Sequence, residues 1–226
     1  MEQEVKKGRY TKGEEIFNAV SHIVAASLVL VGLIVGVVLA SLGGSSAWAI
    51  VSFIVYCVCA MLAFIASSIY HFLRQNRAKR LFRIFDHCAI FLLIAGTYTP
   101  ICLVILRDVG AWGWTLFGIL WFMAIVGIVL KSLFMNNKLV TRIGMITYLV
   151  MGWCAVIAIY PLLGALHPNG FWLLVAGGIV YTLGAVVYLL GKVKKRRRYI
   201  HSVWHLFVLV ASILHYFAIL FYVLLY

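Results

Sequence analysis

Seven apolar runs, each long enough to cross a membrane as a helix, constrain what this chain can fold into. A helix needs about 20 mostly apolar residues to span the hydrocarbon core of a bilayer. The predicted spans are 18–42, 46–73, 84–106, 111–133, 139–161, 170–191 and 200–224. They use up most of the 226 residues. The sequence therefore predicts an all-α integral membrane protein, a single seven-helix domain over 1–226 with a short cytoplasmic tail at 1–15.

Composition excludes a soluble globular protein. Hydrophobic residues make up 65% of the chain, charged residues make up 11%, and the mean hydropathy is +1.08. In soluble domains about a quarter of the residues are charged. The net charge of +13 is therefore interpreted as that of a membrane protein.

The basic residues gather on one side of the predicted topology. All except Arg107 fall in the tail and in the connections between the second and third, fourth and fifth, and sixth and seventh spans. They are Lys6, Lys7, Arg9, Lys12, Arg74, Arg77, Lys79, Arg80, Arg83, Lys131, Lys138, Arg142, Lys192, Lys194, Lys195, Arg196, Arg197 and Arg198. The positive-inside rule places the amino terminus in the cytoplasm and the carboxyl terminus outside. These charges can also attract anionic inner-leaflet headgroups, and we expect no nucleic-acid partner.

Five polar residues on three of these helices share one predicted depth. They are Ser67, His71, Asp86, His201 and His205. Each lies within seven residues of a predicted cytoplasmic arginine, or about 10 Å at 1.5 Å per residue. Ionisable groups inside a membrane are costly and usually functional, so this layer is the candidate site.

The spacing of these residues is typical of a metal site. His201 and His205 share a helix face at i and i+4, as do Ser67 and His71. With His71 as a third ligand, a tetrahedral zinc would keep one position for water, which is the arrangement of catalytic zinc. Asp86 could then act as the base for that water, and Ser67 could orient it or donate to a developing oxyanion.

Simpler interpretations of the same residues remain open. Asp86 could pair with Arg83 one turn earlier, or cap the start of its helix. His71, His201 and His205 could each be an independent polar residue near the membrane interface. The sequence favours a metal site because the three histidines and the aspartate coincide in depth.

Two further polar features are less specific. Glu14, Asn18 and His22 form a stripe at i, i+4 and i+8, which could support the metal ligands from behind or be only the amphipathic entry of the first span. His215 lies off the face of His205, and we expect it to be a packed residue with a hydrogen-bond partner on another helix.

Several segments resemble the bacterial hemolysin III family. The resemblance lies in the runs 67–71 (SSIYH), 85–90 (FDHCAI), 96–100 (GTYTP) and 201–205 (HSVWH), and it extends from 14–18 (EEIFN) to the last span. That family is grouped with the progestin and adipoQ receptors, including the adiponectin receptors, and more distantly with the alkaline ceramidases.

The resemblance implies roles for four residues. It implies that His71, His201 and His205 bind Zn²⁺ on the cytoplasmic side, and that Asp86 contacts the zinc-bound water. It also implies location in a bacterial plasma membrane. Receptor relatives carry a long amino-terminal cytoplasmic region with no counterpart in this sequence, which argues against a hormone-receptor function.

Three functions fit these observations. The first is a zinc-dependent lipid hydrolase of the amidase or ceramidase kind, with a part in membrane lipid homeostasis. The second is a non-enzymatic sensor or receptor in which zinc is structural, and the third is a cytolysin, as the family name suggests. Membrane lipids are the expected substrates or ligands, but no residue in the sequence selects a headgroup, a protein partner or an oligomeric state.

Overall fold

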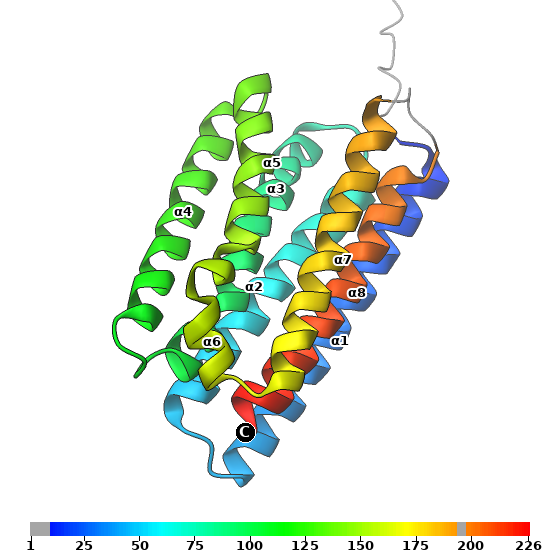
Figure 1. Cartoon of the computed structure of the whole chain (residues 1–226). Helices are drawn as coiled ribbons and strands as arrows, with labels where there is room; N and C mark the ends of the chain where they lie inside the picture. Colours follow the sequence, from blue (N-terminus) through cyan, green and yellow to red (C-terminus); the bar gives the residue numbers. More distant parts are fainter. Residues whose placement is uncertain (1–9, 194–197) are drawn as a thin grey trace, which may run out of the picture.

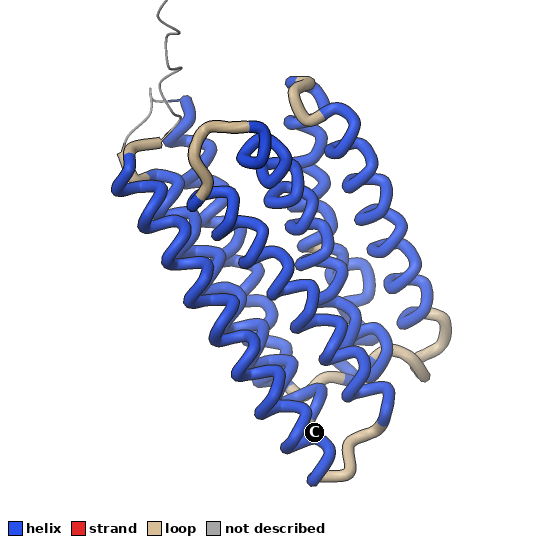
Figure 2. The backbone as a smooth tube through the Cα atoms, turned by 180° about the vertical axis from the view of Figure 1, so that it is seen from behind, coloured by secondary structure: helices blue, strands red, loops and turns tan. Residues whose placement is uncertain are grey.

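The computed structural model describes residues 10–193 and 198–226, and these fold into a bundle of helices without any strand (Figure 2). Within these residues, seven helical segments are long and apolar enough to cross a membrane. They are Lys12–Leu42, Ala47–Phe72, Arg77–Ile105, Trp112–Phe134, Lys138–Ala165, Pro168–Gly191 and Ile200–Leu224. The prediction of a seven-helix, multi-pass membrane protein is confirmed.

Four of the seven spans are single α-helices and three are interrupted. The single helices are α1 (Lys12–Leu42), α2 (Ala47–Phe72), α4 (Trp112–Phe134) and α7 (Pro168–Val193). The interrupted spans are α3 (Arg77–Pro100) with the π-helix η1 (Ile101–Ile105), α5 (Lys138–Gly152) with the 3₁₀ segment η2 (Cys154–Ala158) and α6 (Ile159–Ala165), and α8 (Ile200–Ile219) with the π-helix η3 (Leu220–Leu224). The candidate site residues all lie in regular α-helix.

Helix α1 begins at Lys12, six residues before the predicted span and inside the predicted 1–15 tail. The cause is a capping box. The Glu14 backbone N–H donates to Thr11 Oγ1 at 3.3 Å, and the Thr11 backbone N–H donates to Glu14 Oε2 at 2.7 Å. As a result Glu15 sits on a regular helical turn instead of in an irregular tail.

The starts of α1 and α8, the end of α7 and the connections α2–α3 and α4–α5 lie at one end of the bundle, at the top of Figure 1. We call this the basic end, and the other, which carries the carboxyl terminus, the opposite end. Of the basic residues used to predict orientation, several lie outside the described residues: Lys6, Lys7, Arg9, Lys194, Lys195, Arg196 and Arg197. A cytoplasmic location of the basic end stays a prediction.

The helices that carry the candidate site are neighbours. Helix α1 packs against α2 and α8, and α2 packs against α3. A small buried cluster rich in alanine draws on these four helices: Ala25, Ala26, Ala60, Ala63, Phe64, Ala89, Leu93 and Val208. Small side chains allow membrane helices to approach closely, so polar side chains on different helices can meet.

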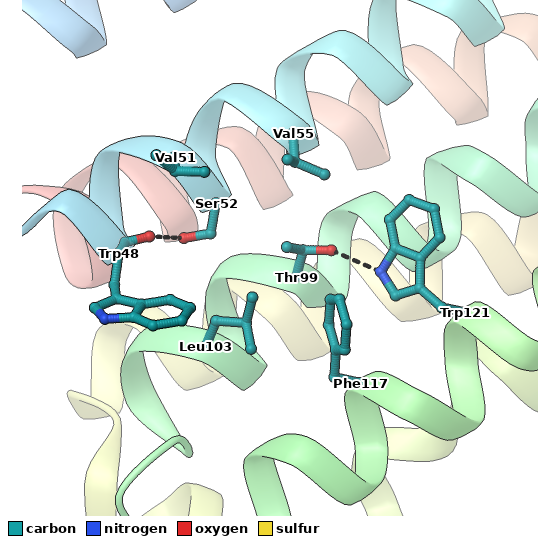
Figure 3. Close-up of a pocket in the computed structure, with 8 residues that line it drawn as sticks. All are labelled: Trp48, Val51, Ser52, Val55, Thr99, Leu103, Phe117 and Trp121. Carbon is teal, nitrogen blue, oxygen red and sulfur yellow. Dashed lines mark hydrogen bonds between the residues drawn. The ribbon is translucent and has the colours of Figure 1, made fainter.

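The packing toward the opposite end uses larger side chains. A second buried cluster contains Phe53, Tyr56, Phe91, Leu120 and Met151 among others. Near the start of α2, the end of α3 and the start of α4 lies an apolar groove of about 300 Å³ (Figure 3). Its lining residues are Trp48, Val51, Ser52, Val55, Thr99, Leu103, Phe117 and Trp121. The groove is remote from the candidate site.

Candidate metal centre

The structure brings three of the predicted residues together at the basic end. His201 Nε2 lies 3.2 Å from His71 Nε2 and 3.2 Å from His205 Nε2. One ring nitrogen from each histidine falls within 4.8 Å of the others, so the group could hold a metal ion. His71 and His205 are buried and His201 is half-buried. We refer to these three residues as the histidine cluster.

The spacing of the cluster fits a tetrahedral metal ion. With metal–nitrogen bonds of about 2.0–2.1 Å, two imidazole ligands of tetrahedral zinc lie roughly 3.3 Å apart. The two Nε2 separations of 3.2 Å in the cluster are close to that value. Three imidazoles are also a ligand set that zinc accepts, with one position left for water. The residues therefore fit a zinc ion, although other divalent metals also accept imidazole.

Helical periodicity and close packing create the cluster. His201 and His205 face the same way because they are one turn apart on α8, whose first turn follows Tyr199 at a left-handed φ of 63°. His71 lies in the last turn of α2. The alanine-rich packing of α1, α2, α3 and α8 allows the histidine-bearing helices to converge.

A carboxylate that sequence reasoning missed holds His71. Glu15 Oε2 lies 2.7 Å from His71 Nδ1, and Glu15 Oε1 accepts a 2.7 Å hydrogen bond from Lys79 Nζ. Lys79 is buried, and its ammonium also donates to the backbone carbonyl of Leu73 at 3.0 Å. The sequence offered a signal, since Glu15, Asn18 and His22 are spaced i, i+3 and i+7 and share a face.

Asp86 lies beside the cluster and does not cap a helix. Ser67 is within hydrogen-bonding reach of the Asp86 carboxylate, and His71 interacts with that carboxylate electrostatically. Helix α3 is capped by Asn76, so Asp86 sits well inside it, and the capping interpretation is wrong. The guanidinium of Arg83 donates to Asn136 Oδ1 at 3.2 Å.

The three residues of the predicted stripe on α1 have different surroundings: Glu14 caps the helix, whereas Asn18 and His22 lie beside His205. Glu14 closes the capping box and accepts a 2.8 Å hydrogen bond from the Tyr199 backbone N–H, which ties the starts of α1 and α8. The ring of His22 stacks on His205 with centroids 3.7 Å apart, and Asn18 is buried beside them with its backbone interacting with His205. A supporting role for Asn18 and His22 at the metal stays a prediction.

Two other contacts complete the picture of the histidines. The ring of Tyr10, also missed by sequence reasoning, stacks on His201 with centroids 4.9 Å apart, so Tyr10 covers one face of the His201 ring. His215 interacts through Nε2 with the Leu174 carbonyl at 3.1 Å. The prediction that His215 is a packed residue with a partner on another helix is confirmed.

Fold and site together define a class: a seven-helix membrane protein with three histidines and a neighbouring aspartate gathered at one end. Comparison with known families agrees with this class. The family model described as haemolysin-III related matches residues 10–216. The chain belongs to this family.

Individual relatives cover nearly the whole chain. It is 43% identical over 211 residues to hemolysin-3 of Bacillus cereus, a match that covers 93% of this chain and 92% of the relative. It is 39% identical over 213 residues to the hemolysin-3 homolog of Bacillus subtilis (strain 168), covering 94% and 96%. It is 26% identical over 219 residues to the human monocyte to macrophage differentiation factor, covering 94% and 86%.

Proposed function

We propose that this protein is a zinc-dependent hydrolase that cleaves acyl-amide bonds of membrane lipids, with its site on the cytoplasmic side of a bacterial plasma membrane. The observation that carries the proposal is the histidine cluster with Asp86 and Ser67 beside it. Three neutral ligands and an adjacent carboxylate match a catalytic zinc better than a closed structural one, which has four protein ligands.

The proposed chemistry divides between the metal and the protein. When bound, zinc lowers the pKa of its water to about 7 and polarises a carbonyl oxygen. Asp86 is the base that accepts the proton of the attacking water and can return it to the leaving amine. Ser67, whose hydroxyl lies within hydrogen-bonding reach of the Asp86 carboxylate, would orient that carboxylate toward the water.

The proposal predicts that Asp86→Asn separates metal binding from turnover. The variant keeps the histidine cluster but loses the base, so its turnover should fall by about 10²–10⁴-fold while its zinc content stays at the wild-type level. Turnover is measured by mass spectrometry on a panel of ceramides and other acyl-amide lipids in mixed micelles.

Asp108→Asn is the matched control, because Asp108 is an exposed aspartate paired with Arg107 away from the cluster. It should behave as the wild type. Equal turnover in Asp86→Asn and the wild type would contradict the role of Asp86. A zinc-loaded wild type without turnover on the whole panel would favour the sensor with structural zinc.

The names of the Bacillus relatives suggest a second function, cytolysis. A cytolysin should release dye from protein-free liposomes at low protein dose. Retention of the dye by liposomes that contain correctly inserted protein would argue that any haemolytic effect is indirect.

A further inference from the structure

We propose that Glu15 on α1, a helix that supplies no ligand to the histidine cluster, is the residue that positions His71 for the metal, and that Lys79 shares the same carboxylate through its other oxygen. This inference rests on the proposed metal site. It goes beyond that site because it assigns control of metal affinity to a carboxylate on a helix that carries no metal ligand.

The hydrogen-bond chemistry of Glu15 determines which nitrogen of His71 is available. An ionised carboxylate only accepts hydrogen bonds, and a neutral imidazole has one donor and one acceptor nitrogen. Because Glu15 Oε2 lies 2.7 Å from Nδ1, Nδ1 carries the proton. The lone pair is then on Nε2, the atom that lies 3.2 Å from His201 Nε2. Glu15 therefore selects the metal-binding form of His71.

Lys79 occupies the second oxygen of the Glu15 carboxylate. Its ammonium donates to Glu15 Oε1 at 2.7 Å and to the Leu73 carbonyl at 3.0 Å, and it lies 5.0 Å from the centre of the Tyr70 ring. Lys79 is buried, and a buried ammonium needs a partner of opposite charge. Each oxygen of Glu15 thus has its own donor, one from α2 and one from α3.

The count of acceptors makes the inference testable by a double-mutant cycle. Glu15→Gln leaves one oxygen for two donors, and the buried ammonium of Lys79 is the stronger donor because it is charged. His71 therefore loses its acceptor. Lys79→Met removes the competing donor and leaves the carboxylate on His71. In Glu15→Gln/Lys79→Met the single amide oxygen is free to accept from His71 again.

Zinc affinity of the full-length protein in detergent, measured by competition with a chelator, should follow this pattern. Loss of a residue that orients a metal-binding histidine typically costs about 10–100-fold in affinity, and we expect that loss in Glu15→Gln. Lys79→Met should stay within about threefold of the wild type, and the double variant should regain at least half of the logarithmic loss.

Unfolding temperatures of the metal-free proteins separate positioning from general stability. If Glu15 served only to hold helices together, affinity would follow the unfolding temperature, and the double variant would be the weakest binder. That result, or wild-type affinity in Glu15→Gln, would overturn the inference. If Glu15→Gln does not fold, the double variant still decides: it should bind zinc within about tenfold of the wild type, and an affinity reduced by about 100-fold would overturn the inference. A wild type that binds no zinc would overturn the metal site itself.

Discussion

The two ends of the bundle use their polar side chains differently. Toward the opposite end, the threonine hydroxyls of α3 donate within their own helix: Thr97 donates to the Leu93 carbonyl at 2.7 Å and Thr99 to the Ala95 carbonyl at 2.9 Å. At the basic end, ionisable side chains meet across helices, as His71 does with Glu15 and with the histidines of α8. The difference separates polar residues that merely fit in a membrane helix from those that form a site.

Chemistry explains this difference. A threonine hydroxyl can donate its hydrogen bond to the backbone carbonyl one turn earlier, so its proton needs no acceptor on a neighbouring helix. A carboxylate or an imidazole has to find its partners on other helices. Packing differs in the same way, since alanine is prominent in the cluster nearer the basic end and aromatic side chains in the cluster nearer the opposite end. The comparison predicts that substitutions at the basic end change the zinc content, whereas substitutions toward the opposite end change only the stability.

The largest effect is expected at the histidine cluster. His205→Ala removes one of three ligands and should reduce bound zinc to background, measured by elemental analysis of the purified protein. His215→Ala, on the same helix, is the control. It removes a half-buried side chain that contacts the Leu174 carbonyl, so stability should fall while zinc remains. A full equivalent of zinc in His205→Ala would break the comparison.

An intermediate effect, on stability alone, is expected where α4 meets α3. A Cβ added at Gly127 would clash with the fully buried ring of Phe91. Gly127→Ala should therefore lower the free energy of unfolding by about 1–3 kcal/mol, measured by denaturation in detergent, with zinc content unchanged. Gly118→Ala adds the same methyl group on the same helix, where nothing lies within 4 Å, and should be neutral. Equal losses in both variants would contradict the packing argument.

The smallest effect is expected at the groove in Figure 3. Thr99 Oγ1 accepts a 3.1 Å hydrogen bond from Trp121 Nε1. Thr99→Val removes this bond between helices, and we expect a loss of about 0.6 kcal/mol, the average for such bonds in membranes. Thr97→Val removes a bond within one helix and should cost less. A change of zinc content in either variant would show that the two ends are coupled.

The sequence predicted the spans well because apolar runs report directly on membrane insertion. It placed the start of α1 too late, although Thr11 and Glu14 carry the capping-box pattern that defines that start. A prediction based on hydropathy overlooks this pattern, because the first turn of α1 is polar and therefore falls outside the apolar run. The break of the fifth span between α5 and α6 was likewise not predicted.

The sequence predicted the depth of the candidate site in the membrane, but it did not identify every residue of the site. Charge positions gave the depth of His71 and His205, and helical spacing gave the pairs on each helix. Which residues of α1 face the cluster depends on the rotation of that helix, and Glu14 and Glu15 are both compatible with the stripe through Asn18. Only packing decided that Glu15 reaches His71 while Glu14 caps the helix.

The metal content of the purified wild-type protein tests this account most directly. Full-length protein, extracted in detergent without chelators and freed of loosely bound ions, should carry one zinc ion per chain by elemental analysis. Less than about a tenth of an equivalent, after supplementation with zinc and removal of the excess, would contradict it.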